Sequence, residues 1–197
     1  MATPPILSHF WTTDQHHVGP SRDPCSSNAY MPISPYVREL RALIGTERLL
    51  LPSVAGIVRH DDQLLLVRSR DDGRWSLPGG AIELQDTPAN AVVREVWEET
   101  GLYIAPKKLM GVYGGPAFVV RYSNGDETQY ISSMFECDIV SGELRPDGDE
   151  VDAARFWTHA EAEALPLSPW LPRVLPRLFS PNDDTWFERA TWTPPQN

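Results

Sequence analysis

Three glutamates and one arginine stand close together in the middle of this chain, at spacings that suit a metal site. They are Arg94, Glu95, Glu98 and Glu99. At about 100° per residue, a helix would gather them within an arc of about 140°. Carboxylates three or four residues apart repel one another, and a divalent cation removes that repulsion. Because Mg²⁺ prefers oxygen ligands and binds substrate phosphates beside one or two carboxylates, the cluster predicts a metal platform for phosphate chemistry.

The segment that carries this cluster has the signals of a short helix. Thr87 can cap its start, Pro88 suits its first turn, and Gly101 suits a left-handed residue at its end. These signals predict a helix over residues 88–100. Opposite the charged face we expect an apolar face made of Ala89, Val92, Val93, Val96 and Trp97.

Residues 80–102 resemble a Nudix box, whose pattern is G-x5-E-x7-R-E-U-x-E-E-x-G-U, where U is an aliphatic residue. The matching residues are Gly80, Arg94, Glu95, Val96, Glu98, Glu99, Gly101 and Leu102. Asp86 departs from the pattern because it replaces the first glutamate. The preceding residues 75–80 also resemble the strand and turn that lead into this box. So many fixed residues at fixed spacings argue against a chance match.

This resemblance implies an α/β/α sandwich around a mixed β-sheet, and hydrolysis of a nucleoside diphosphate linked to another group. Phosphoanhydride cleavage needs charge neutralisation, alignment and an activated water, which metal ions provide together. The resemblance implies Mg²⁺ or Mn²⁺ as the ion. Its implied ligands are Glu95, Glu98 and Glu99, with the main-chain carbonyl of Gly79 or Gly80 completing the set.

The resemblance gives further residues a role beside the metal. Arg94 would orient the carboxylates, because a guanidinium matches paired oxygens and keeps its charge. The family pattern pairs this arginine with residue 86, where Asp86 is one methylene shorter than glutamate. Glu83 could assist the metals or be a solvated loop carboxylate. Glu150 could be an extra catalytic group, as general base, or belong to a charged loop beside a strand.

Substrate contacts are weakly encoded. The aromatic residues that could stack on a base, or instead belong to the core, are Trp75, Tyr113, Phe118, Tyr122 and Tyr130. Relatives that cleave ADP-ribose tend to carry a proline about fifteen residues beyond the box, and Pro116 stands near that position. An ADP-ribose-like compound is therefore one candidate substrate, and the leaving group, whether sugar, nucleotide, phosphate or coenzyme, is left open.

Length and charge narrow the class of protein. The chain has 197 residues and a formal net charge of −10, which suits one domain with extensions. The acidity argues against stable binding to nucleic acid or to anionic membranes, which need clustered Lys and Arg. No segment approaches the roughly 20 apolar residues of a membrane span, and the N-terminus lacks the pattern of a signal peptide. We expect a cytoplasmic protein with a nucleotide-like small-molecule substrate.

The chain divides into four predicted parts. Residues 1–33 form an irregular arm that could join a homodimer contact, 34–49 a preceding helix, 50–165 the Nudix domain, and 166–197 a Pro-rich segment and tail. The order of strands and helices predicts an α+β (mixed α/β) fold. The expected strands are 54–58, 63–68, 75–77, 109–113, 118–122, 129–139 and 151–157, and a later helix starts at Thr158.

Three functions remain open at this stage. The leading one is a metal-dependent Nudix pyrophosphohydrolase. The second keeps the fold but changes the reaction, as in isopentenyl diphosphate isomerase, and would need a catalytic cysteine. Cys137 is a candidate, although its apolar neighbours favour a place in the core. The third is a ligand sensor without turnover, whose box is usually eroded, whereas the three helix glutamates are intact here.

Overall fold

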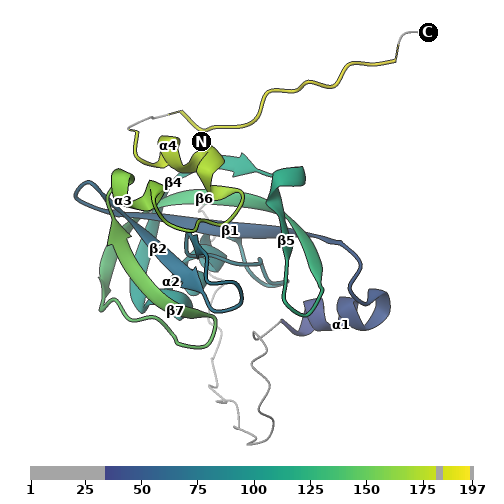
Figure 1. Cartoon of the computed structure of the whole chain (residues 1–197), viewed down its shortest axis with the longest axis horizontal. Coiled ribbons are helices and arrows are strands. Elements are labelled where there is room, and N and C mark those ends of the chain that lie inside the picture. The colour runs from purple at the N-terminus through teal and green to yellow at the C-terminus, as the bar shows by residue number, and fades with distance from the viewer. Residues whose placement is uncertain (1–33, 181–183, 196–197) are drawn as a thin grey trace, which may run out of the picture.

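A computed structural model describes residues 34–180 and 184–195 of the chain. Within these residues, seven strands form a mixed sheet with helices on both of its faces (Figure 1). The predicted mixed α/β class is confirmed. In chain order the elements are α1 (Pro35–Ile44), β1 (Leu49–His60), β2 (Gln63–Ser69), β3 (Trp75–Ser76), α2 (Pro88–Thr100), β4 (Leu102–Tyr113), the 3₁₀ turn η1 (Pro116–Phe118), β5 (Val119–Arg121), β6 (Glu127–Gly142), β7 (Val151–Trp157), α3 (His159–Glu163) and α4 (Leu171–Leu178).

The sheet is built around one parallel pair of strands. β1 and β6 run parallel, with Leu49 opposite Thr128 at one end and Val58 opposite Cys137 at the other. The main path of the sheet is β3-β2-β1-β6-β4, while β5 pairs with β6 and β7 pairs with β2. These remaining pairs are antiparallel. A parallel pair needs a long crossover connection, and the chain between β1 and β6 carries α2.

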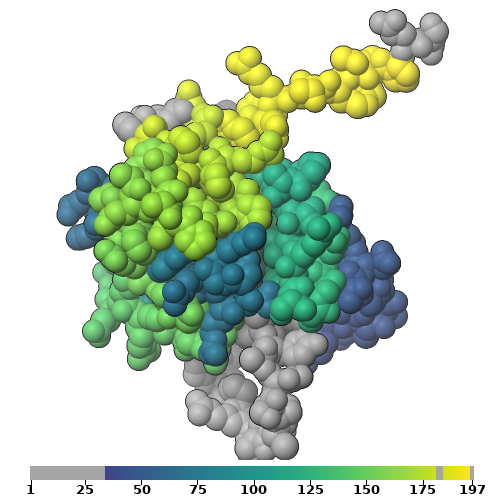
Figure 2. Space-filling model, in the orientation of Figure 1, coloured from purple at the N-terminus to yellow at the C-terminus, as the bar shows by residue number. Residues whose placement is uncertain are grey.

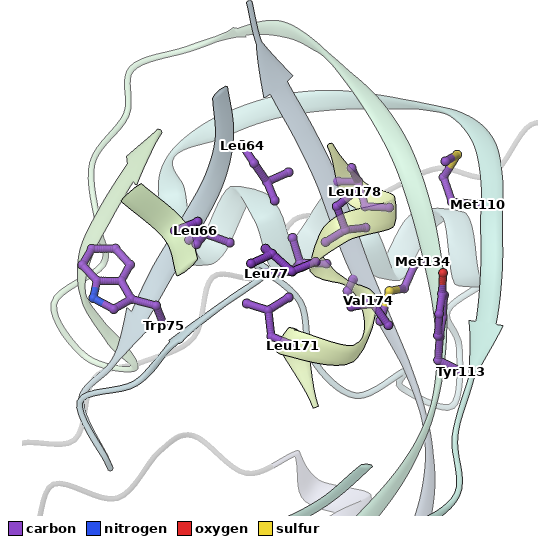
Figure 3. Packing of buried hydrophobic residues seen from close by; sticks show 14 of the residues in the cluster. Leu64, Leu66, Trp75, Leu77, Met110, Tyr113, Met134, Leu171, Val174 and Leu178 are labelled. Carbon is purple, nitrogen blue, oxygen red and sulfur yellow. The ribbon is translucent and has the colours of Figure 1, made fainter. Parts of the chain in front are cut away.

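Alternate strand residues fill two separate cores, one on each face of the sheet. In β2, Leu64 and Leu66 belong to the first core and Leu65 to the second, as the two-residue period of a strand requires. α4 covers the first core, and its apolar side chains point toward the strands (Figure 3). α2 covers the second core through Val92 and Val96. The site helix is therefore anchored by sheet packing.

The two predicted ends of the site helix, at Thr87 and Gly101, are confirmed. The Thr87 side chain caps α2, and Gly101 ends it with a left-handed φ of 71°. β4 is much longer than the predicted strand 109–113. The prediction was too short because Pro106 argues against a strand in the sequence, whereas the structure accommodates this proline at a register shift between β4 and β6. The predicted strand 118–122 was too long, since η1 occupies its start and β5 only Val119–Arg121.

The buried face of α2 is turned about the helix axis relative to the predicted apolar face, so that it includes two of the glutamates. Trp97 was expected to pack, yet it is 51% exposed. Glu95 and Glu99 are instead buried on the same arc as Val92 and Val96. The reason is that this arc faces both the sheet and the turn after β3. The carboxylates therefore lie inside the molecule, where burial affects their charge.

The C-terminal segment, which was predicted as a Pro-rich segment and tail over 166–197, contacts the domain through Trp186. The Trp186 N–H donates to the Met110 carbonyl at 2.8 Å, and the Trp186 carbonyl accepts from Val112 N–H at 3.2 Å. The indole also stacks on Tyr113, with ring centroids 4.5 Å apart. Beyond this anchor the chain runs out from the body (Figure 2). Trp186 therefore fixes one point of the C-terminal segment against β4, and the predicted limits of that segment stay a prediction.

Two predictions about the chain's ends stay as predictions. The N-terminal arm over 1–33, with its predicted homodimer contact, lies outside the described residues. The limits of the predicted domain, 50–165, also stay a prediction, although α4 beyond it contributes Leu171 and Leu178 to the first core. No helix in the described part of the chain is long and apolar enough to cross a membrane.

Candidate active site

A cleft of about 830 Å³ lies between the first halves of β1 and β6, the helix α2 and the loops around them. Its described lining contains every polar residue predicted for the metal and catalytic site, together with the glycine turn. These residues are Gly79, Gly80, Glu83, Arg94, Glu95, Glu98, Glu99 and Glu150. Folding thus brings together groups from the β3–α2 loop, the helix and the loop before β7.

The glycine turn before α2 fits around the two buried carboxylates. Gly79 has a φ of +149°, and an added Cβ would lie 2.2 Å from the Val54 carbonyl oxygen. At Gly80, an added Cβ would lie 2.6 Å from Oε2 of Glu95. The Gly79 N–H donates to Oε2 of Glu99 at 2.9 Å. Two glycines are needed here because backbone and carboxylates approach closely.

Arg94 connects the loop to the helix carboxylates. Its Nε and Nη2 donate to Oδ2 of Asp86 at 3.1 and 3.0 Å. Its Nη1 donates to Glu95 at 2.8 Å and to Glu98 at 3.0 Å. The side chain of Asp86 therefore reaches the arginine although it is one methylene shorter than glutamate. The loop brings the aspartate close, since the Asp86 N–H donates to the Glu83 carbonyl at 3.0 Å.

Glu95 and Glu99 lie one helical turn apart, and burial makes their charges unfavourable. Their residues are only 9% and 7% exposed. Burial raises the pKa of Glu95 to about 7, although the Arg94 charge opposes the shift. Burial also raises the pKa of Glu99 well above its ordinary value, and Glu95 and Glu150 add to the increase. A cation in the cleft would favour the charged forms of these side chains.

Glu150 joins this acidic group from the loop before β7. Burial raises the pKa of its carboxyl to about 7, and Asp147 and Glu98 reinforce the shift. Its backbone is fixed, because its N–H donates to Asp147 at 3.1 Å and its carbonyl accepts from Arg70 N–H at 2.9 Å. The position suits a group that exchanges a proton near neutral pH.

The outer carboxylates of the site are less buried. The side chain of Glu98 is 55% exposed and bonds to Arg94. Glu83 lines the cleft from the loop and is partly buried. Both side chains therefore have room to turn toward a ligand.

The predicted aromatic contacts divide into two groups. Phe118, Tyr122 and Tyr130 line the cleft, whereas Trp75 and Tyr113 are outside its described lining. Trp75 packs edge-on against Trp157 in the core, and Tyr113 stacks under Trp186. Trp75 and Tyr113 thus have the core position that was the alternative to base stacking. Contact of any of these aromatic residues with a substrate stays a prediction.

Some lining residues were missed by reasoning from the sequence. Trp170 stacks on Phe118 with centroids 5.5 Å apart, although the two are far apart in the chain. Arg41 on α1 donates from Nη2 to Oγ1 of Thr128 at 3.0 Å. A weak signal existed for Arg41, since it stands four residues after Val37 on the apolar stripe of its helix.

The donor set fits a hard divalent cation, although the carboxylates are turned to other partners in this conformation. Within residues 34–180 and 184–195, no three acidic, histidine or cysteine side chains enclose a position for an ion. Arg94 holds Glu95 and Glu98, and the Gly79 N–H holds Glu99. Carboxylate oxygens are nevertheless the ligands that Mg²⁺ and Mn²⁺ prefer, and a bound cation would lower the raised pKa values of Glu95 and Glu99. The Gly80 carbonyl already accepts Val54 N–H at 2.9 Å, which favours Gly79 as the carbonyl ligand.

Sequence comparisons find relatives with pyrophosphatase names. The chain is 38% identical over 113 residues to an ADP-ribose pyrophosphatase of Methanocaldococcus jannaschii, which covers 55% of this chain and 63% of that protein. It is 55% identical over 62 residues to a MutT-like protein of Streptomyces ambofaciens, and the aligned segment covers 31% of this chain and 40% of that protein. The matches thus span less than two thirds of the relatives' own length.

Solved structures share the fold. A UDP-X diphosphatase superposes with a TM-score of 0.56 at 23% identity, over 73% of this chain and 70% of that one. An ADP-ribose pyrophosphatase of Streptococcus suis superposes with a TM-score of 0.53 at 23% identity, over 66% of this chain and 89% of that one. The NUDIX domain model matches residues 50–178. Since that match spans more than half of the sequence and confirms the resemblance of the box, the chain belongs to the Nudix family.

Proposed function

We propose that this chain is a divalent-metal-dependent pyrophosphohydrolase that cleaves a phosphoanhydride bond in a nucleoside diphosphate linked to another group. The observation that carries the proposal is the pair Glu95 and Glu99, buried one helical turn apart beside the cleft. Burying two carboxylates side by side is costly unless a cation compensates them. Membership of the Nudix family and the named pyrophosphatase relatives support the same reaction.

In this proposal the ion is Mg²⁺ or Mn²⁺, held by Glu95, Glu98 and Glu99 with the Gly79 carbonyl. The bound ion would neutralise phosphate charge and lower the pKa of a water molecule. Arg94 keeps the carboxylates in place through its bonds to Glu95 and Glu98. Glu83, at the edge of the cleft, is a further candidate ligand.

Glu150 is the proposed general base. With a pKa of about 7, its carboxylate can accept a proton from a water molecule at neutral pH and release it again. Its backbone is fixed, and its carboxyl is close enough to the helix glutamates to raise their pKa values. A residue that takes up the proton at this position would make the water a better nucleophile toward phosphorus.

The finer substrate assignment is an ADP-ribose-like compound. Phe118 and Trp170 form an aromatic stack beside the cleft, and such a surface suits a nucleobase. The relative from Methanocaldococcus jannaschii is named for ADP-ribose. The proposal also includes a cytoplasmic location and a homodimer, both of which rest on the interpretation of the sequence alone.

The two alternative functions receive no support. An isomerase would need an accessible catalytic cysteine, yet Cys137 is buried in the second core and burial raises its pKa to about 12. A sensor without turnover would be expected to lose box carboxylates, whereas Glu95 and Glu99 are retained. Turnover is therefore the better-supported reading.

The test is a panel of purified substrates incubated with Mg²⁺, Mn²⁺ or EDTA, with products separated by chromatography. The panel comprises ADP-ribose, NADH, a dinucleoside polyphosphate and an oxidised nucleoside triphosphate. We expect AMP and ribose 5-phosphate from ADP-ribose in the metal arms only. Loss of product in Glu99→Gln, with retention in the exposed-site control Glu143→Gln, would identify the box as the source. Wild-type protein that releases no product with either metal would refute the proposal.

A further inference from the structure

The cleft contains two tyrosines whose hydroxyl groups bond to each other. The hydroxyl oxygens of Tyr122 and Tyr130 are 2.7 Å apart, and both residues line the cleft. Tyr122 follows β5 and Tyr130 lies on β6, so the hairpin turn at Asn124 and Gly125 sets their spacing. Burial raises the pKa of both phenols, which therefore keep their protons at neutral pH.

A chain of hydrogen bonds leads from a buried arginine to this pair. Arg41, with a side chain only 10% exposed, donates from Nη2 to Oγ1 of Thr128 at 3.0 Å. Thr128 lies two residues before Tyr130 on the same face of β6, and as a hydrogen-bonding group beside the phenol it lowers the pKa of Tyr130. Arg41 is held by the carbonyls of Glu47 and Glu127 at 2.6 and 2.7 Å. The first donor of the chain is thus fixed in position.

The donor-only character of arginine gives this chain a direction. Since Oγ1 of Thr128 accepts from Arg41, its own proton is directed to the oxygen of Tyr130. If Tyr130 then donates to Tyr122, the proton of Tyr122 is left over. If Tyr122 donates to Tyr130, the proton of Tyr130 is left over. In either case one phenolic O–H within this chain of hydroxyls can donate to a ligand, and the other oxygen can accept.

The surroundings favour a neutral hydroxyl over another phosphate as that ligand. The pair lies near the acidic group, because Tyr122 interacts electrostatically with Glu150 and Tyr130 with Glu95. The described lining carries ten acidic side chains and three arginines. Each arginine already bonds to a carboxylate, as Arg121 does to Glu127 at 2.5 Å. An additional phosphate would meet repulsion there, whereas a sugar hydroxyl needs one donor and one acceptor.

We infer that the Tyr122–Tyr130 pair binds a hydroxyl of a sugar attached to the distal phosphate of the substrate, and selects nucleoside diphosphate sugars. Thr128 acts as a positioning residue for the pair. This inference rests on the proposed function, because it assumes that a diphosphate lies beside Glu95 and Glu150. It assigns substrate choice to uncharged groups on β5 and β6, outside the box helix.

The test compares two substrates with the same diphosphate. ADP-ribose carries the second sugar, and the methyl ester of ADP lacks it. In the double variant Tyr122→Phe/Tyr130→Phe, the ratio of kcat/KM for ADP-ribose to that for the methyl ester should fall about fivefold to tenfold. The matched control Tyr36→Phe/Tyr103→Phe, whose tyrosines are outside the cleft lining, should keep the wild-type ratio. An unchanged ratio, or equal losses on both substrates, would overturn the inference.

Two further measurements test the positioning role of Thr128 and the binding of ADP-ribose. Thr128→Val should lower the same ratio about twofold to fivefold, and Thr128→Ser, which keeps the hydroxyl, should restore it. If the wild type hydrolyses neither compound, the proposed function fails, and calorimetric titration with ADP-ribose and Mg²⁺ decides the inference. Wild-type affinity at least fivefold above that of the double tyrosine variant supports it. Equal affinities, or no wild-type binding, overturn it.

Discussion

Replacing Glu150 with glutamine should stabilise the metal-free protein above neutral pH and have little effect in acid. The pKa of this carboxyl is about 7 in the folded state and 4.5 when unperturbed, with burial as the main cause. The folded state therefore binds the proton more tightly than the unfolded state. Between pH 4.5 and about 7, wild-type stability falls as pH rises, because folding must then accommodate the charged form. Glutamine has no such penalty.

The size of the effect follows from the same pKa difference. The difference between a pKa of about 7 in the folded state and 4.5 in the unfolded state corresponds to a loss of at most ~3 kcal/mol in the free energy of unfolding of the wild type at pH 8. Because the carboxyl is partly exposed, solvent screening reduces the expected gain to about 1 kcal/mol. Below pH 4.5 the wild-type carboxyl is protonated in both states. The difference between variant and wild type should vanish there.

Urea unfolding in EDTA at pH 4.5, 6, 7 and 8 measures this difference. Glu143→Gln is the matched control, since Glu143 is an exposed glutamate in the same loop between β6 and β7. Parallel pH profiles of wild type and Glu150→Gln would refute the assignment of a raised pKa to Glu150. In the presence of Mg²⁺ and an identified substrate, the same variant should lose kcat more than it raises KM, as expected for a proton acceptor.

Three further predictions concern the box. Glu99→Gln should lose at least about tenfold in kcat, or ~1.4 kcal/mol of transition-state stabilisation, and show a smaller Mg²⁺-induced rise in Tm than wild type. Equal shifts in Tm together with undiminished turnover would remove this residue from the metal site. Arg94→Lys should lower the free energy of unfolding, measured in urea, by about 1–3 kcal/mol. Lysine keeps the charge but cannot bond to Asp86, Glu95 and Glu98 at the same time. Unchanged stability would show that the network contributes little. Asp86→Glu should change stability by less than about 1 kcal/mol and should not raise kcat/KM, because Asp86 already accepts two bonds from the arginine; a clear gain in activity would show that this pairing is suboptimal.

The sequence alone determined the site helix and its chemistry. Thr87 and Gly101 predicted both ends of α2, because capping and left-handed termination are local properties. The spacing of Glu95 and Glu99 also placed them one turn apart without knowledge of the fold. Gly80 was recognised as part of the turn from its position in the box. These features depend on neighbours within a few residues, which a sequence displays directly.

Only the tertiary structure decided which face of α2 is buried and what completes the cleft. The exposure of Trp97 and the burial of Glu99 depend on how the helix lies against the sheet and the glycine turn. The bond from Arg41 to Thr128 joins residues 87 positions apart, and no local pattern encodes such a distance. Pairing of β1 with β6 brings these partners together. Contacts between distant segments are decided by packing, because many sequences satisfy the same local preferences and the fold selects which side chains meet.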